Sequence, residues 1–497
     1  MNFLILIFLF PGFFGPSSAE CSPLIASFSS DFAFSENGNL KELYQRTTNF
    51  DFRNDEVFQP NETTLSGITS KPLNDKSIEK ILSGNVSLIF LQTLAFARNP
   101  DLESSKKTIQ ARAEMYPQTM FVDALAAQYR SFTQAIETRT SSSAMGESQE
   151  LFFPSPGIST FNGKLARLEV EMAMEEYFMK LRNLEIKLLN KAAEYQMFRA
   201  SISVTEKNLA ALEAFGNSLK TRFITGKSMY PELTRLQVEQ DRMKNDRASM
   251  LRMQKASIAE INHLLARAAD GSFGSIQLPS LNFPVDRKNL TQAAQEKRQE
   301  VRIAEIGIKL LETLLSLKKR FVFAKISPGF AYPKSGMTSK SNQSNSEMGI
   351  GKNSSAALDS YKISFGTDVT MPNPLELAEQ ASYLRELEQQ IGSEKAKVAE
   401  IRNSTISELT EAVTGFENAR ESLKTERNIV FPRLETTLDS AGSAYRTGQI
   451  AFSDWMELFL SSFSSQMNSI RYEFEAYKAL GKIFEVSGSC NFPTGKN

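Results

Sequence analysis

The sequence of 497 residues contains very little histidine and cysteine, because His263 is its single histidine and Cys21 and Cys490 are its two cysteines. Zinc sites, haem sites and histidine-dependent catalysis therefore have few possible ligands or bases. We expect His263, which lies in a helical context, to be structural. The sequence shows no nucleophile–histidine–acid set, phosphate-binding loop or metal-spaced cluster, so we expect neither an enzyme nor a cofactor.

The sequence also lacks an excess of charge of one sign, since 57 Lys and Arg residues balance 57 Asp and Glu residues. Nucleic-acid-binding proteins normally carry a basic excess, so we expect no nucleic-acid partner. After the N-terminal residues there is no run of about 18 apolar residues, and no transmembrane helix is expected. A chain of this kind could enter a membrane only by its strands.

The first 19 residues are typical of a signal peptide. Phe3 to Phe10 is an unbroken apolar run, Pro11 and Gly12 interrupt it, and Ser17-Ser18-Ala19 supplies small residues for cleavage. No Lys or Arg precedes the run. A short membrane anchor is the alternative interpretation, although the run is too short to span a bilayer.

The two cysteines lie near opposite ends of the exported chain. Cys21 would stand almost at the mature N-terminus, and Cys490 stands near the C-terminus. An even number of cysteines in an exported protein suggests a disulfide that ties the two ends together. Lipidation of Cys21 is the alternative, although Ser18-Ala19-Glu20 before it fits such a signal poorly.

One segment of the chain occurs twice. Arg222-Phe223-Ile224-Thr225-Gly226 is followed by Pro231 to Leu236, and Tyr445-Arg446-Thr447-Gly448 is followed by Ser453 to Leu458. The two glycines lie 448 − 226 = 222 positions apart. Each copy has an acidic residue six positions after its glycine and a leucine ten positions after it. The repetition predicts a duplication of about half the chain.

Each half indicates the same order of elements: helix, strand, loop, strand, long helix, glycine-containing tip and long helix. The long helices are predicted from proline-free stretches in which apolar residues follow alternating steps of three and four, a spacing typical of coiled coils. In the first half, Lys191 interrupts such an apolar stripe. The stripe consists of Leu181, Leu184, Leu188, Tyr195, Phe198 and Ile202.

Proline, glycine and residue periodicity predict the boundaries of the elements. In the first half we expect a helix from Asn85 to Ala113 ended by Met115-Tyr116-Pro117, strands over 119–133 and 150–153, and long helices over 163–221 and 231–269. In the second half we expect a helix over 289–317, strands over 321–332 and 361–371, and proline-free helices on both sides of Pro432. The predicted divisions are a signal peptide over 1–19, an irregular segment over 20–75, a first repeat over 76–275, a linker over 276–287, a second repeat over 288–488 and a tail over 489–497.

The strand from Tyr361 to Met371 alternates apolar and polar residues over about eleven positions, which is the length and pattern of a transmembrane barrel strand. Four strands per chain cannot close a sheet, and open edges are excluded from lipid. Closure therefore requires several chains, and three chains would give twelve strands. The same reasoning makes the long helices line a shared tube.

With these features the chain resembles the TolC family of outer-membrane efflux proteins over roughly residues 80 to 487. The two glycine-containing tips carry the resemblance most specifically. It is supported by Asn99-Pro100-Asp101-Leu102, by Gly163 to Arg167 and by Val369 to Pro374, of which the last two look most like the heavy-metal-efflux branch.

The resemblance implies a mainly α fold with a small β part. It implies long antiparallel coiled-coil hairpins and four antiparallel strands per chain, which trimerise into a 12-stranded outer-membrane β-barrel and a periplasmic helical tunnel. The implied function is an exit duct of a tripartite efflux or type I secretion system, with a periplasmic adaptor and an inner-membrane pump as partners. A periplasmic coiled-coil scaffold without a pore is the alternative, and the cargo stays open among metal ions, drugs and proteins.

The resemblance also assigns candidate pore and gate residues. Asp454 and Glu457 match acidic positions that face the pore; three positions apart, they share one helix face, where stacked carboxylate rings in a trimer would favour cations. A solvated helix face is the alternative interpretation. Tyr445 and Glu232 match a pair that links the inner and outer hairpins in relatives. A second link uses a basic residue two positions after the glycine, where this chain has Ile450.

The tips themselves are implied to contact the adaptor. Thr225 and Thr447 are the candidate contact residues, and Gly226 and Gly448 are expected to permit the backbone turns at the tips. Ordinary glycines of helical hairpins would look identical in sequence. The 17 methionines are expected to fill apolar cores rather than to bind metal.

Overall fold

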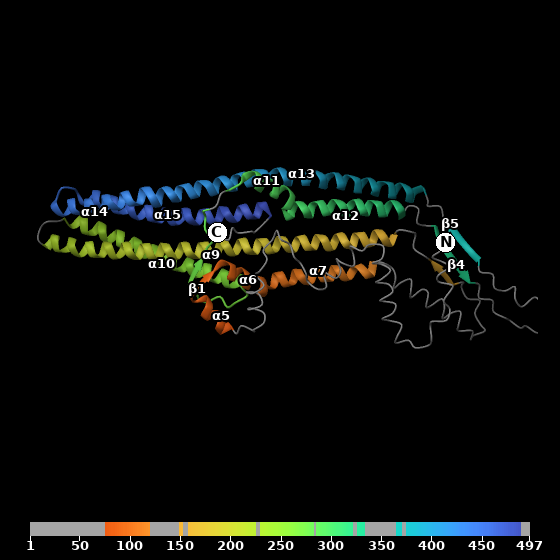
Figure 1. Ribbon diagram of the computed structural model, residues 1–497, viewed down its shortest axis with the longest axis horizontal. Helices are drawn as coiled ribbons and strands as arrows, with labels where there is room; N and C mark the ends of the chain where they lie inside the picture. Colours follow the sequence, from red (N-terminus) through yellow and green to blue (C-terminus); the bar gives the residue numbers. More distant parts are fainter. Residues whose placement is uncertain are drawn as a thin grey trace, which may run out of the picture. The chain divides into compact units, whose positions relative to one another are not determined.

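The computed structural model describes residues 75–119, 149–152, 158–224, 229–282, 285–321, 326–332, 364–369 and 374–488 (Figure 1). Most of these residues are helical and few form strands. The predicted signal peptide, the irregular segment up to residue 74, Cys21 with Cys490, and Thr225 with Gly226 lie outside the described residues.

The described residues belong to two compact units, and each unit combines segments from both sequence repeats. The first contains residues 108–173 and 306–395, and the second contains residues 75–107, 174–305 and 396–488. The two predicted repeats therefore do not coincide with these two units.

The first unit holds a three-stranded antiparallel sheet in the order β2-β4-β5. Its strands are β2 (Gln149–Phe152), β4 (Ile326–Tyr332) and β5 (Ser364–Val369), with Leu151 opposite Phe330 and Phe330 opposite Phe365. Three of the four predicted strands are thereby confirmed over these ranges. The fourth, predicted over 119–133, lies outside the described residues from position 120 onward.

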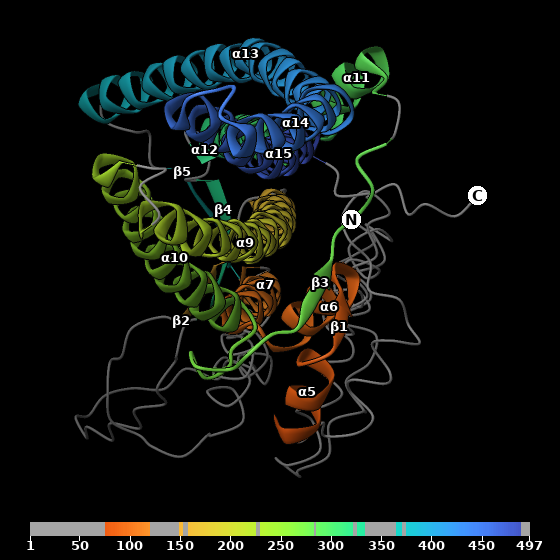
Figure 2. The same ribbon diagram turned by 90° about the vertical axis from the view of Figure 1, so that its left-hand side faces the viewer.

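The predicted long hairpins are confirmed. The first consists of α9 (Ile158–Ile224) and α10 (Tyr230–Leu264). The second consists of α13 (Pro374–Thr425), the π-helix η1 (Glu426–Val430), α14 (Phe431–Thr447) and α15 (Phe452–Ser487). In the second unit α9 runs beside α10, and α14 runs beside α15 (Figures 1 and 2). None of the described helices is both long and apolar enough to cross a bilayer.

The predicted apolar stripe of α9 is buried along its whole length. The exposed fractions of its residues lie between 0% and 9%. Lys191, which interrupts the stripe in sequence, reaches Glu194 at 2.8 Å and Glu260 of α10 at 2.6 Å. The charge therefore stays at the edge of the interface and pairs across the first hairpin. The buried stripe consists of Leu181, Leu184, Leu188, Tyr195, Phe198 and Ile202.

The π-helix accommodates a proline in an otherwise continuous long helix. Pro432 has no backbone N–H, and its ring would clash with the carbonyl of Asn428, four residues earlier, in a regular α-helix. The wider turn from Glu426 to Val430 contains that carbonyl. Because π-turns inside α-helices are rare and concentrate at functional positions, this turn distinguishes the second hairpin from the first.

The single helix predicted from Asn85 to Ala113 is wrong. The chain forms β1 (Asn85–Ser87), α6 (Leu88–Arg98) and α7 (Pro100–Thr119). Asn99 is extended, and its side-chain Oδ1 accepts from the amides of Asp101 and Leu102, which caps α7. The predicted end at Met115-Tyr116-Pro117 is also wrong, since α7 continues through Pro117.

A short parallel strand pair was not predicted. β1 pairs with β3 (Ser275–Gln277), which overlaps the predicted linker, and Val86 lies opposite Ile276. Figure 2 shows this pair grouped with α5 (Asp75–Leu82) and α6. The pair is held to α9 because the Tyr195 hydroxyl donates to the carbonyls of Phe273 and Gly274 at 2.9 and 2.8 Å.

The helix predicted over 289–317 is divided into α11 (Arg287–Lys297) and α12 (Gln299–Phe321). Arg298 is extended at the break, and its guanidinium donates to Thr405 at 2.7 Å and contacts Glu408 at 3.3 Å. Next to the break, buried Arg182 contacts Glu300 at 2.6 Å. Burial alone would raise the pKa of Glu300, but the bonds and charge of Arg182 outweigh it and lower that pKa.

The predicted end of the second long helix at Ala269 is also wrong, because α10 ends at Leu264. Ala266 has a positive φ of 51°, and the amide of Arg267 donates to the carbonyl of Asn262 at 2.9 Å. This closes the helix without the glycine that usually occupies such a position.

Gly448 ends α14 in the left-handed conformation, with φ 78°. Its amide donates to the Tyr445 carbonyl at 3.1 Å, and the amide of Gln449 donates to the Ala444 carbonyl at 2.9 Å. The sequence-based expectation of a glycine-dependent turn at this tip agrees with this geometry.

We predict that Gly448→Ala lowers the free energy of unfolding by about 1–2 kcal/mol, because alanine disfavours positive φ. A Cβ at Gly448 meets nothing within 4 Å, so the cost is confined to the backbone. Gly415→Ala in α13 is the matched control. Its Cβ also meets nothing within 4 Å, and it should stabilise the helix by about 0.5–1 kcal/mol. Urea unfolding followed by far-ultraviolet circular dichroism measures both variants. A shift of the free energy of unfolding in the same direction for both would contradict the backbone assignment at Gly448.

Candidate functional site

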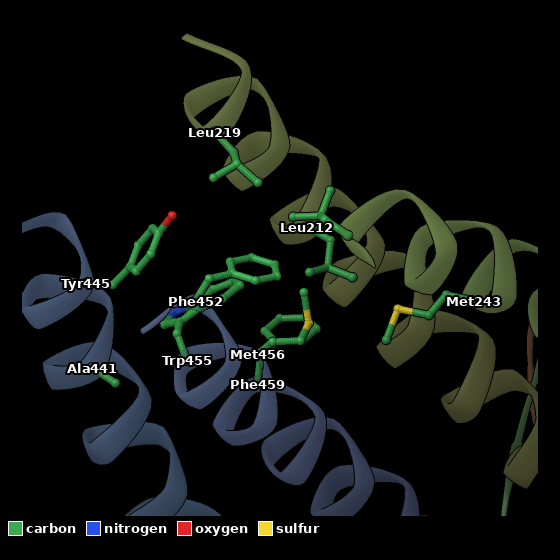
Figure 3. Packing of buried hydrophobic residues seen from close by; sticks show 10 residues of the cluster. Leu212, Leu219, Met243, Ala441, Tyr445, Phe452, Trp455, Met456 and Phe459 are labelled. Atoms are coloured by element: carbon green, nitrogen blue, oxygen red, sulfur yellow. The ribbon is translucent and has the colours of Figure 1, made fainter. Parts of the chain in front are cut away.

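The tips of the two hairpins meet in one apolar cluster, here named the tip cluster. Four helices contribute to it: the last turns of α9, the first turns of α10, the end of α14 and the start of α15 (Figure 3). Of the residues that the sequence predicted for the gate, Tyr445 belongs to it. Its buried members are Leu212, Leu219, Leu236, Met243, Ala441, Tyr445, Phe452, Trp455, Met456 and Phe459.

Aromatic rings join the two hairpins in this cluster. Phe215 of α9 stacks on Trp455 of α15, with ring centroids 3.7 Å apart and planes 9° apart. The same Phe215 ring lies 5.6 Å from Tyr445 and 6.3 Å from Phe452. Offset or tilted aromatic contacts of this kind add to the free energy of apolar burial. The ring of Phe215 therefore inserts between aromatic side chains of the second hairpin.

Tyr445 and Glu232 lie together, as the resemblance implied. The Tyr445 hydroxyl donates to Glu232 Oε2 at 3.3 Å, from the last turn of α14 to the first turn of α10. The Tyr445 side chain is buried in the tip cluster, and Glu232 is half-buried. The contact is present in the structure, whereas its role in closing a channel stays a prediction.

Arg222 adds a contact that sequence reasoning did not assign. Its guanidinium lies over the Tyr445 ring at 4.8 Å and donates to the carbonyls of Tyr445 and Arg446 at 3.4 Å each. These carbonyls belong to the last turn of α14, where a helix carries partial negative charge. The signal in the sequence was the position of Arg222 inside the repeated segment, directly before Phe223, which corresponds to Tyr445 in the second copy.

Asp454 and Glu457 are exposed on α15, on the opposite side from Trp455 and Met456, which are buried. Asp454 accepts a hydrogen bond from the Ser453 hydroxyl at 3.1 Å. Glu457 lines a surface groove of about 450 Å³ between α15 and the η1–α14 segment. Both carboxylates thus face away from the tip cluster, and their arrangement as pore rings stays a prediction. The groove is also lined by Glu426, Val430, Leu434, Leu460, Ser461, Ser464, Ser465 and Asn468.

The two tips differ in chemistry. Thr447 and Gly448 are exposed, and the Thr447 hydroxyl donates to the Ala444 carbonyl of its own helix at 2.9 Å. At the first tip, large apolar side chains are exposed: Ile224 by 83%, Met229 by 72% and Tyr230 by 66%. Sequence reasoning missed this apolar patch, although the apolar residues beside the tip glycine were its visible signal. Ile450 packs partly buried against the tip cluster.

Comparison with known proteins identifies the fold. No family model and no curated protein matches the sequence. Among solved structures, the outer-membrane channel OprN matches with a TM-score of 0.65 and 13% identity, over 89% of this chain and 95% of that chain. The CmeC outer-membrane channel of Campylobacter jejuni matches with a TM-score of 0.59 and 9% identity, over 90% and 96%. The open state of the Neisseria gonorrhoeae MtrE outer-membrane channel matches with a TM-score of 0.56 and 13% identity, over 81% and 89%.

The chain has the fold of these outer-membrane channels. The prediction of a mainly helical fold with a small β part is thereby confirmed in its coarse form. The similar structures are all outer-membrane channels. At 9–13% identity the shared channel fold leaves the roles of individual residues to be argued from this chain's own contacts.

We predict that the Tyr445–Glu232 bond persists through neutral and mildly alkaline pH. Burial, together with the nearby Glu232 charge, raises the pKa of Tyr445, although Arg222 acts in the opposite direction. A raised folded-state pKa gives stability that is complete below the unfolded value of about 10 and is lost as pH rises through the folded value. Comparing thermal midpoints of the native chain and Tyr445→Phe between neutral pH and strong alkali checks this.

At neutral pH the free energy of unfolding of the native chain should exceed that of Tyr445→Phe by about 1 kcal/mol. This difference should disappear only above about pH 10. Because Tyr445→Phe retains the ring, its contacts with Phe215 and Phe452 act as an internal control. A difference between the two proteins that changes between about pH 6 and 9 would contradict this assignment.

Proposed function

We propose that this chain is the outer-membrane exit duct of a tripartite efflux or type I secretion system. In this role it passes substrates passively from an inner-membrane pump to the exterior and carries out no chemistry itself. The observation that carries the proposal is the channel fold, shared over 89% of this chain and 95% of the chain of OprN. The duct would lie in the outer membrane and extend into the periplasm.

The sheet of the first unit supports assembly into a trimer. Among the described strands, β2 and β5 each pair on one side only, since β4 lies between them. An open sheet edge leaves backbone N–H and C=O groups without partners, which lipid does not tolerate. Three chains with four strands each would close a 12-stranded barrel and remove every edge. The hairpins would then surround a common periplasmic tunnel.

The second hairpin is the stronger candidate for the lining of that tunnel. Its exposed face carries Asp454 and Glu457, and the groove beside Glu457 adds the small polar residues Ser461 and Ser464. Rings of such carboxylates would favour cations near the inner end of a trimer. The π-turn at Glu426–Val430 lies in this hairpin, which supports the view that it is the moving part during opening.

The first tip is the stronger candidate for the contact with a periplasmic adaptor. Ile224, Met229 and Tyr230 form an exposed apolar patch there, and exposed apolar patches mark protein-binding surfaces. The second tip would add the polar contacts of Thr447 and Gly448, and Thr225 with Gly226 would complete the first. The adaptor would thus bind mainly to the hairpin that braces the gate.

We predict that Asp454→Asn with Glu457→Gln lowers the cation preference of the channel by about twofold or more, because each trimer loses six carboxylates from the proposed pore. Reversal potentials of the purified full-length protein in planar bilayers under a salt gradient measure this preference. Asp241→Asn, an exposed acid on α10 of the first hairpin, is the matched control and should leave the preference unchanged.

Unchanged selectivity in a conducting double variant would overturn the pore assignment. A purified chain that gives no conductance and no heat-sensitive trimer band from outer-membrane fractions would instead favour the alternative, a periplasmic coiled-coil scaffold without a pore.

We predict that a photo-activatable residue at position 224 or 229 cross-links to a periplasmic adaptor in cells. The same residue at position 238, where Val238 is 43% exposed farther along α10, should not do so. Ile224→Ser with Met229→Ser should weaken adaptor binding by about tenfold, since two exposed apolar groups are lost from the contact. Cross-links confined to copies of this same chain would show that the patch serves assembly of the duct instead.

A further inference from the structure

We propose that Phe215 and Arg222 of α9 form a latch that holds the second hairpin against the first and keeps the duct closed. This inference rests on the proposed function, because it names the residues that regulate the proposed gate. The latch contacts the second hairpin at two places. Phe215 packs on the rings of Trp455 and Phe452, and Arg222 binds the last turn of α14 at Tyr445 and Arg446.

The two latch residues share one face of α9. Leu212, Phe215, Leu219 and Arg222 follow steps of three, four and three residues, which places them along a single stripe of the helix. Leu212 and Leu219 are buried in the tip cluster, with exposed fractions of 0% and 1%. The stripe therefore points at the second hairpin, and the latch residues lie on it at successive levels.

Phe215 supplies the apolar part of the latch. Its ring stacks on Trp455 at 3.7 Å and also lies within 6.3 Å of Phe452. Trp455 and Phe452 are only 6% and 4% exposed in this arrangement. Withdrawing the second hairpin would remove Phe215 from both rings and expose them to water, which opposes the movement.

Arg222 supplies the polar part. Its guanidinium lies 4.8 Å from the centre of the Tyr445 ring and donates to the carbonyls of Tyr445 and Arg446. Arg222 lies in the last turn of α9 and reaches the last turn of α14, so one cation neutralises the C-terminal partial charges of two helices. These contacts cross from the first hairpin to the second and are lost when the hairpins separate.

The direction of this contact accounts for Ile450. In relatives a basic residue at that position forms a second link, and the resemblance implied that this link is missing here. In this chain Ile450 is apolar and packs against the tip cluster. The cation instead comes from the first hairpin, through Arg222, and its acceptors are backbone carbonyls of the second.

The test uses the purified full-length chain in planar bilayers. Phe215→Leu keeps an apolar side chain but removes the stack, and Arg222→Gln removes the cation. Each should raise the open probability by about tenfold, and Arg222→Lys should have an intermediate effect because it keeps the charge without the planar fork. Lys220→Gln is the matched control, since Lys220 is an exposed cation in the same turn of α9.

The single tryptophan of the chain provides a second readout that does not depend on conductance. Because Trp455 stacks on Phe215, its fluorescence emission should shift to longer wavelength in Phe215→Leu as water reaches the ring. Far-ultraviolet circular dichroism and the trimer band establish that each variant is folded, and both should be unchanged.

The outcomes separate the latch from the proposed duct. Channels that open as rarely in Phe215→Leu and Arg222→Gln as in the native chain and Lys220→Gln would overturn the latch while the duct stands. If no version conducts, the proposed duct itself is wrong. An equal rise in Arg222→Gln and Lys220→Gln would show that loss of positive charge at the tip, rather than the Arg222 contact, opens the channel, and would also overturn the latch.

Discussion

The apolar stripe along α9 is the constraint on which the rest of the structure depends. It begins among Leu181 and Leu188, which are almost fully buried, and continues to Leu212 and Leu219 at the tip. A helix of 67 residues can be stable in water only if such a stripe is covered, because helix propensity alone contributes little. The second hairpin provides part of that cover at the tip. The same contact that stabilises α9 therefore also determines where the two hairpins meet.

The polar network around Arg182 shows a second physical requirement. Arg182 is 1% exposed, and an unpaired buried guanidinium would be strongly destabilising. Glu300 and Gln299 pair with its two terminal nitrogens at 2.6 Å each, directly after the chain breaks between α11 and α12 at Arg298. The break in the first repeat at Asn99 has the same place in the order of elements, yet it is stabilised by an amide cap. The two predicted repeats therefore break at corresponding places in the order of elements and stabilise these breaks with different chemistry.

The two hairpins are also unequal in a way that suits different tasks. The first has two uninterrupted helices and an exposed apolar tip around Ile224 and Met229. The second contains the π-turn before Pro432 and carries Asp454 and Glu457 on its exposed face. In the proposed duct, the first hairpin would brace the gate and bind the partner, and the second would move around a polar path. Phe215 and Arg222 lie where these two tasks meet.

The sequence by itself determined the long hairpins, three of the strands and the position of the tips. These features depend on local signals: the spacing of proline, the period of apolar residues and the glycine at a left-handed turn such as Gly448. The helix break at Arg298 and the β1–β3 pair depended on partners far away in the chain. The break at Asn99 and the early end of α10 depended on local caps that the apolar period does not reveal. The bond between Tyr445 and Glu232 could be anticipated only through resemblance, since 213 positions separate the two residues. The contacts of Arg222 with the end of α14, and the insertion of Phe215 beside Trp455, were decided by the tertiary structure alone. The period of apolar residues predicts which face of a helix is buried, whereas the packing of the whole chain determines which residue covers that face.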